Sequence, residues 1–184
     1  TWRDGKTKGM RSFQKEKMES LEKQLSNQDG MLVSVKKKPK KVYAPLLYDL
    51  TELQRDANKR FGLSAKETLN IMQRLYENHK VLTYPRTDSR YISADIVPTI
   101  GERLQACAVG PYRKSAGSLG AKLGRGKASQ ESMAKKLWGK ASFVNDAKVS
   151  DHHAIIPTEQ FVKLEHMTNE ERKMYDLVVK CFLA

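Results

Sequence analysis

Residues 50–77, LTELQRDANKRFGLSAKETLNIMQRLYE, carry the strongest helix signals of the chain. Two capping boxes, residues 51–54 and 64–67, each place a hydroxyl three positions before a Gln or Glu that can return a hydrogen bond. The first predicts a helix that ends near Phe61, because Gly62 can take the left-handed conformation that closes helices. The second predicts a helix through about residue 77. Its expected inner face is Ala65, Leu69, Met72, Leu75 and Tyr76.

The segments on either side predict a mainly α protein with a small β portion. Apolar residues at four-residue spacing predict a helix from about residue 13 to 27. Alternation at Met31, Val33 and Val35 predicts a strand, which the Lys- and Pro-rich residues 36–41 continue as an exposed edge in preference to a DNA contact. Residues 81–84 predict a short β segment, residues 98–108 a helix, and a third capping box at 168–171 a closing helix.

The charge of the chain points to a polyanionic partner. The net charge is +13 over 184 residues, and residues 111–140 contain eight Lys or Arg against one acid, Glu131. Generic solubility is the alternative explanation. Low periodicity over residues 110–145 predicts a basic mobile loop with one short helix at 130–137.

Compartment signals agree with a protein that works in the cytoplasm. The apolar runs are too short to span a bilayer, so no membrane partner is expected, and no N-terminal signal is present. Cys107 and Cys181 lie far apart in apolar helical contexts, which favours free thiols in a reducing compartment.

One octapeptide suggests chemistry: Thr83-Tyr84-Pro85-Arg86-Thr87-Asp88-Ser89-Arg90. Proline disfavours helix for the residue before it, so Tyr84 should be extended, and alternate side chains then share a face. Tyr84 and Arg86 would point the same way, with Asp88 nearby. A phenol beside a guanidinium that grips phosphate in bidentate fashion suits a tyrosine that attacks a phosphodiester. Ordinary packing is the usual role of a tyrosine.

A second motif is Asp151-His152-His153-Ala154-Ile155-Ile156-Pro157-Thr158. Adjacent histidines project in different directions, so no metal site is expected from them. One histidine, oriented by Asp151, could instead bind a phosphate or donate a proton.

In this order, LTELQ (50–54), QRLYE (73–77), TYPRTDS (83–89) and DHHAIIPT (151–158) resemble type IA DNA topoisomerases, and specifically their bacterial topoisomerase III branch. The resemblance implies that Tyr84 is the nucleophile linked to the 5′ phosphate of a cut single strand, and that Arg86 and His152 contact that phosphate. It also implies DNA contacts by Arg86, Thr87, Asp88, Ser89, Arg90, His152 and His153.

The same resemblance implies the surroundings of the site. Residues 1–50 would be part of a β-rich arch, and residues 51–184 a helical, catabolite-activator-like tyrosine domain. In the family, Mg²⁺ belongs to a separate Toprim domain, and no such acidic cluster exists here, so no cofactor is expected in this fragment. The expected partners are DNA, chiefly single-stranded, and the other domains of the same monomeric enzyme in the bacterial nucleoid.

Two alternatives stay open at the level of the sequence. Residues 51–77 could be a non-catalytic helix-turn-helix that binds duplex DNA, with Tyr84 inert. A tyrosine recombinase or type IB enzyme would place several dispersed arginines before a late tyrosine. The early position of Tyr84, ahead of His152, counts against that class.

Overall fold

The computed structural model describes residues 3, 5, 8–26, 28–30 and 34–184, and the chain divides into two compact units, Thr1–Val42 and Tyr43–Ala184. The division falls eight residues earlier than the expected boundary at 50/51, because residues 43–50 join the second unit. Leu47 is buried there, and Tyr48 forms an antiparallel β-bridge with Ile155. That residues 1–50 belong to an arch stays a prediction.

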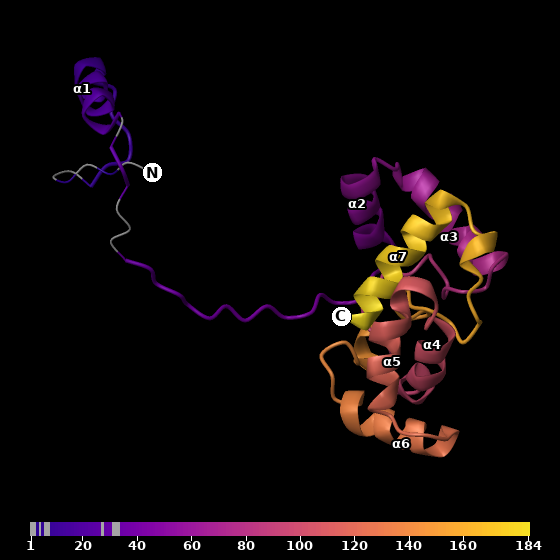
Figure 1. Ribbon diagram of the computed structural model, residues 1–184. Coiled ribbons are helices and arrows are strands. Elements are labelled where there is room, and N and C mark those ends of the chain that lie inside the picture. The colour runs from indigo at the N-terminus through magenta and orange to yellow at the C-terminus, as the bar shows by residue number, and fades with distance from the viewer. Residues whose placement is uncertain (1–2, 4, 6–7, 27, 31–33) are drawn as a thin grey trace. The chain divides into compact units, whose positions relative to one another are not determined.

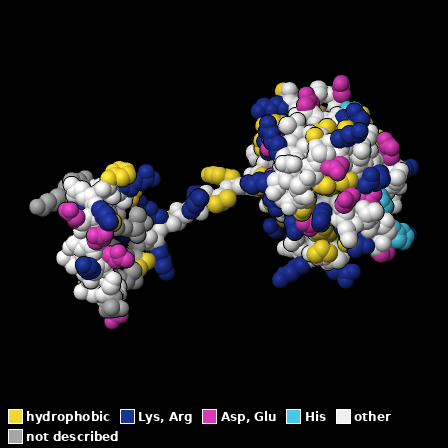
Figure 2. All heavy atoms as spheres, turned by 90° about the horizontal axis from the view of Figure 1, so that it is seen from above, with side chains coloured by type: hydrophobic (Ala, Val, Ile, Leu, Met, Phe, Trp, Pro, Cys, Tyr) yellow, Lys and Arg dark blue, Asp and Glu magenta, His cyan; other side chains and the backbone are white. Residues whose placement is uncertain are grey.

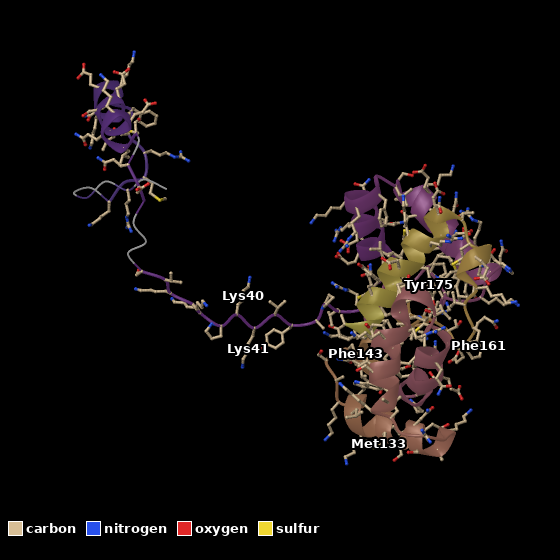
Figure 3. The ribbon with its side chains drawn as sticks, in the orientation of Figure 1. Lys40, Lys41, Met133, Phe143, Phe161 and Tyr175 are labelled. Carbon is tan, nitrogen blue, oxygen red and sulfur yellow. The ribbon has the colours of Figure 1, made fainter. Side chains whose placement is uncertain are left out.

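The first unit contains one helix, α1 (Lys15–Leu25), as the four-residue spacing predicts. None of its residues is buried, and Phe13 just before it is 99% exposed. The predicted strand falls partly outside the described residues, at Met31 and Val33. Residues 34–42 are extended and exposed without strand pairing, and Lys40 and Lys41 point to opposite sides of this segment (Figure 3).

The second unit is mainly helical (Figure 1). Helix α3 (Ala65–Glu77) packs against both α2 (Leu50–Phe61) and α7 (Asn169–Leu183). Helix α4 (Ile100–Ala106) packs against both α5 (Arg113–Ala121) and α6 (Lys127–Trp138). Four short 3₁₀ turns complete the helical structure of the described residues: η1 (Val97–Thr99), η2 (Gly110–Tyr112), η3 (Asp146–Lys148) and η4 (Leu164–His166).

The mainly helical class is therefore correct, whereas the expected β portion is not confirmed. In the described residues, β structure amounts to isolated bridges: Tyr48 with Ile155, Leu82 with Pro157, and Ile92 with Val144. The Leu82 bridge lies in the predicted β segment 81–84. No helix in the described part of the chain is long and apolar enough to cross a membrane.

The ends of α2, α3 and α7 test the capping predictions. Ser64 and Thr168 form the expected capping boxes, and Gly62 is left-handed with φ 71°. The box predicted at Thr51 is wrong, because the N-cap of α2 is Asp49, two residues earlier. The Asp49 carboxylate accepts the amide of Glu52 at 2.7 Å, and Asp is a stronger N-cap than Thr.

The buried face of α3 is also rotated from the one expected. Thr68, Ile71, Met72 and Leu75 are buried, while Ala65 and Tyr76 are exposed. The reason is that α3 packs against both α2 and α7, so the residues of α3 that face these two helices are the buried ones.

The short helix predicted at 130–137 is confirmed as part of α6, but the expectation of irregular structure over the rest of residues 110–145 is wrong, because α5 and α6 occupy most of it. Only Ala116 and Ala134 are fully buried within these two helices, while Leu119, Met133 and Trp138 pack against the core partly exposed, so the apolar periodicity in the sequence is weak. Tyr112, Ala116, Leu123 and Ala134 are buried. Gly101 of α4 allows close approach, since a β-carbon there would lie 3.1–3.3 Å from atoms of Gln130 and Leu123.

Candidate catalytic site

The tyrosine segment is non-helical and bends at Pro85. Pro85, Thr87 and Ser89 are buried, whereas Arg86 and Asp88 are exposed and Tyr84 is half-buried. The bend lies between Tyr84 and Arg86, so the shared face expected for these two side chains in an extended chain stays a prediction.

Threonine hydroxyls fasten this segment to the histidine motif. The Thr87 hydroxyl donates to the His152 carbonyl at 2.9 Å. The Thr83 hydroxyl donates to the Ala154 carbonyl at 3.2 Å and accepts the Ile156 amide at 3.0 Å. Two segments about seventy positions apart in sequence are thus held in a fixed register on both sides of Tyr84.

This register places Tyr84 against His152. Their ring centroids are 4.4 Å apart with the planes inclined at 43°. Tyr76, at the end of α3, contacts the other side of the Tyr84 ring edge-on, at 5.4 Å and 77°. The sequence placed Tyr76 on a packing face, and only the observation that α3 ends beside the motif shows that it belongs to the site. His152 itself is exposed, and histidine side chains reach the surface at one edge of the second unit (Figure 2).

Tyr84 opens onto a cleft of about 950 Å³, whose walls also include Tyr76, His152 and His153. The charged residues of the wall are mainly acidic: Glu77, Asp95, Asp146 and Asp151, against Lys80. Arg86 is exposed and lies outside this lining. The cleft is therefore wide enough for a nucleotide, yet provides little positive charge of its own.

Other predicted DNA-contacting residues have partners within the protein. The Ser89 hydroxyl donates to the Lys148 carbonyl at 2.8 Å, and Arg90 Nε donates to the Leu47 carbonyl at 3.1 Å. Like the Thr87 hydroxyl, these groups shape the loop. DNA contact by Thr87, Ser89 and Arg90 stays a prediction, and the exposed Arg86, Asp88 and His152 are the side chains free to reach a strand.

His153 is turned inward. Its Nδ1 lies 2.7 Å from the Ala154 carbonyl, an arrangement in which Nδ1–H donates. Burial is the main cause that lowers the pKa of His153, and the charge of Arg103 lowers it further. The imidazole is therefore neutral at pH 7, which disfavours a direct ionic contact with phosphate.

The described residues do not provide a metal site. No group of three or more His, Cys, Asp or Glu side chains among them is arranged to hold an ion.

Comparison with known proteins identifies the family. The sequence pattern of the DNA topoisomerase family matches residues 2–184. The chain belongs to this family. It is 58% identical to DNA topoisomerase 3 of Bacillus cereus (strain ATCC 14579) over 184 residues, and 50% identical to DNA topoisomerase 3 of Bacillus subtilis (strain 168) over 186 residues. These similarities confirm the resemblance to the bacterial topoisomerase III branch.

Both alignments cover the whole chain but only part of each relative. The shares of the relatives are 23% for the Bacillus cereus protein and 24% for the Bacillus subtilis protein. The chain thus spans about a quarter of the length of these topoisomerases.

Proposed function

We propose that this chain is the tyrosine-bearing part of a type IA DNA topoisomerase, which cuts one DNA strand, passes DNA through the break and reseals it. The observation that carries the proposal is the position of Tyr84: half-buried, stacked on His152 and open to a nucleotide-sized cleft. The membership in the topoisomerase family and the names of the relatives support it.

In the proposed reaction, the Tyr84 oxygen attacks a backbone phosphorus atom and the bond from phosphorus to the 3′ oxygen breaks. The phenol loses its proton, and the departing 3′ oxygen gains one. The product is a 5′-phosphotyrosine ester with a free 3′ hydroxyl. Reverse attack by that hydroxyl restores the strand, so no nucleotide cofactor is consumed.

The helper residues act on the phosphate. Attack concentrates negative charge on the phosphoryl oxygens, which donors near Tyr84 stabilise. Arg86, exposed just past the bend at Pro85, supplies a planar guanidinium, and His152 supplies an imidazole whose ring lies against that of Tyr84. Thr83 and Thr87 keep these two segments in register.

The wider setting is part of the proposal. The helices of residues 51–184 correspond to a catabolite-activator-like domain, and residues 1–50 to a piece of an arch. The complete enzyme is a monomer of the bacterial cytoplasm that acts on single-stranded DNA and depends on Mg²⁺. A second half-site from the remainder of the protein then supplies the acidic residues and the metal.

Replacement of Tyr84 by Phe in the full-length protein tests the nucleophile. Covalent protein–DNA adducts, trapped by denaturation and resolved on a gel, should disappear while binding of a single-stranded oligonucleotide persists. The matched control is Tyr43→Phe, which removes an exposed hydroxyl outside the cleft lining and should keep adduct formation. Adducts that persist in Tyr84→Phe would mean that another residue is the nucleophile and would overturn the proposal. A parent protein that binds DNA but forms no adduct would favour the alternative, a non-catalytic helix-turn-helix formed by α2 and α3.

A further inference from the structure

The tyrosine cleft is poorly suited to hold DNA by charge alone. Of the charged residues in its wall, four are acidic and one, Lys80, is basic. Phosphates that approach Tyr84 therefore meet a mostly negative surface, yet the chain has a net charge of +13. The binding energy for a polyanion must come from another part of the surface.

Exposed positive charge without an ion-pair partner is grouped on α5, α6 and their connection. Six exposed side chains form what we call the α5–α6 basic surface: Arg113, Lys114, Lys122, Arg125, Lys135 and Lys136. In the part of the chain that the structure describes, none of these six forms an ion pair. The neighbouring Lys127 is neutralised by Glu102 at 2.9 Å.

The α5–α6 basic surface is part of the packed structure and not a loose tail. Tyr112, Ala116, Leu123 and Ala134 bury the inner sides of these helices, and both helices pack on α4. Charges fixed on ordered helices lose less conformational freedom on binding than charges on a flexible loop. Dark blue Lys and Arg side chains also project from the second unit in Figure 2.

The surface is close to the cleft along the chain and in space. Helix α6 contacts η1 (Val97–Thr99), which follows directly on the cleft residues Asp95 and Ile96. A strand that passes through the cleft can therefore continue over α6.

We infer that the α5–α6 basic surface anchors the phosphate backbone of the DNA strand whose scissile phosphate lies at Tyr84, at nucleotides outside the cleft. This inference rests on the proposed function, and it separates two tasks: affinity comes from α5 and α6, and chemistry from Tyr84 and its helpers. The contacts are ionic and independent of base sequence.

The test measures binding of a fluorescein-labelled single-stranded oligonucleotide to the full-length protein by anisotropy at a series of salt concentrations. All variants carry Tyr84→Phe, so the readout does not depend on cleavage. Lys114→Gln, Lys135→Gln and Lys136→Gln together remove three charges from the α5–α6 basic surface. Lys59→Gln, Lys66→Gln and Lys163→Gln remove three equally exposed charges elsewhere and form the matched control.

The α5–α6 variant should bind roughly 10- to 100-fold more weakly near 0.1 M salt, and the slope of log K against log salt should become shallower by about 2. The control variant should keep the original slope. Arg in place of the three α5–α6 lysines should also keep it, and unchanged thermal midpoints show that all variants fold. Equal effects of the two Gln variants, or no effect of the α5–α6 variant, would overturn the inference. Adducts that persist in the Tyr84→Phe protein would overturn the proposed function. The binding result for the α5–α6 variant would still stand in that case.

Discussion

In the proposed reaction Tyr84 depends on its neighbours, because a phenol is a weak nucleophile until it loses its proton. His152 is the ring within 4.4 Å, while Arg86 is exposed beside the same segment without a protein partner among the described residues. An unpaired guanidinium at this position is available to a phosphate, and the substrate itself would fix its geometry.

Arg86→Lys in the full-length protein keeps the charge and removes the planar fork. We expect strand cleavage to slow by about ten- to a thousandfold, the range for loss of one transition-state donor, because an ammonium cannot bind two phosphoryl oxygens in the same way. Single-turnover cleavage of a labelled oligonucleotide measures the rate. A rate equal to that of the parent enzyme would restrict Arg86 to binding or packing.

Part of the site could be read from the sequence at this scale, and part could not. The alternation of buried and exposed side chains over residues 85–89 follows from local backbone geometry, whereas the position of Tyr84 relative to Arg86 across the bend at Pro85 stays a prediction. The link through Thr83 joins residues 71 positions apart, and no local rule predicts such a contact. Tyr76 was missed for the same reason.

Helix α2 shows that a capping pattern fixes the existence of a helix better than its first residue. Both Asp49 and Thr51 can cap, and the structure selects Asp49, with the Leu50 amide bonded to the Thr87 carbonyl at 3.0 Å. Asp49→Ala should therefore lower the free energy of unfolding by about 1 kcal/mol, whereas Thr51→Ala should change it little. Urea unfolding of the two variants distinguishes the caps. If Thr51→Ala lowered the free energy of unfolding more than Asp49→Ala does, Thr51 would be the N-cap, as predicted from the sequence.

Helices α3 and α7 are joined by a buried carboxylate. Glu171 is 3% exposed and accepts Arg74 Nε at 2.8 Å, with His79 Nε2 at 3.4 Å. Burial alone would raise the pKa of Glu171, but the hydrogen bond from Arg74 and those from Thr168 outweigh it and lower the pKa to about 2. The ionised form is therefore strongly preferred in the folded state.

Glu171→Gln should lower the free energy of unfolding by about 2 to 3 kcal/mol at neutral pH, because a charge-assisted pair is lost in a buried place. A depressed pKa stabilises the fold above the unfolded value near 4.5, and the contribution fades as the pH falls toward 2. The difference between parent and variant should shrink over that interval, measured by urea unfolding at a series of pH values. The exposed neighbour Glu170→Gln is the control. A constant difference down to pH 2 would contradict the linkage.

At the scale of the whole chain, long amphipathic patterns were predictable and closely packed small residues were not. Helices α3 and α7 are predictable from their capping boxes and from large apolar side chains such as Met72 and Met174. Helices α5 and α6 pack on α4 with only Ala116 and Ala134 fully buried within them, and their many lysines suggest a loop. The charge of that segment was visible in the sequence, but its ordered presentation required the structure.

The last prediction concerns the chain as a part of a larger enzyme. The described residues include Tyr84 and its helpers but no arrangement that would hold a metal ion, and the relatives are about four times longer. The 184-residue chain incubated with Mg²⁺ and supercoiled plasmid should therefore leave the plasmid supercoiled on an agarose gel. The full-length protein should relax it, EDTA should abolish that relaxation, and Tyr84→Phe should abolish it with Mg²⁺ present. Relaxation by the isolated chain would mean that residues 1–184 form a complete site, and the proposed division of the chemistry between two half-sites would then be wrong.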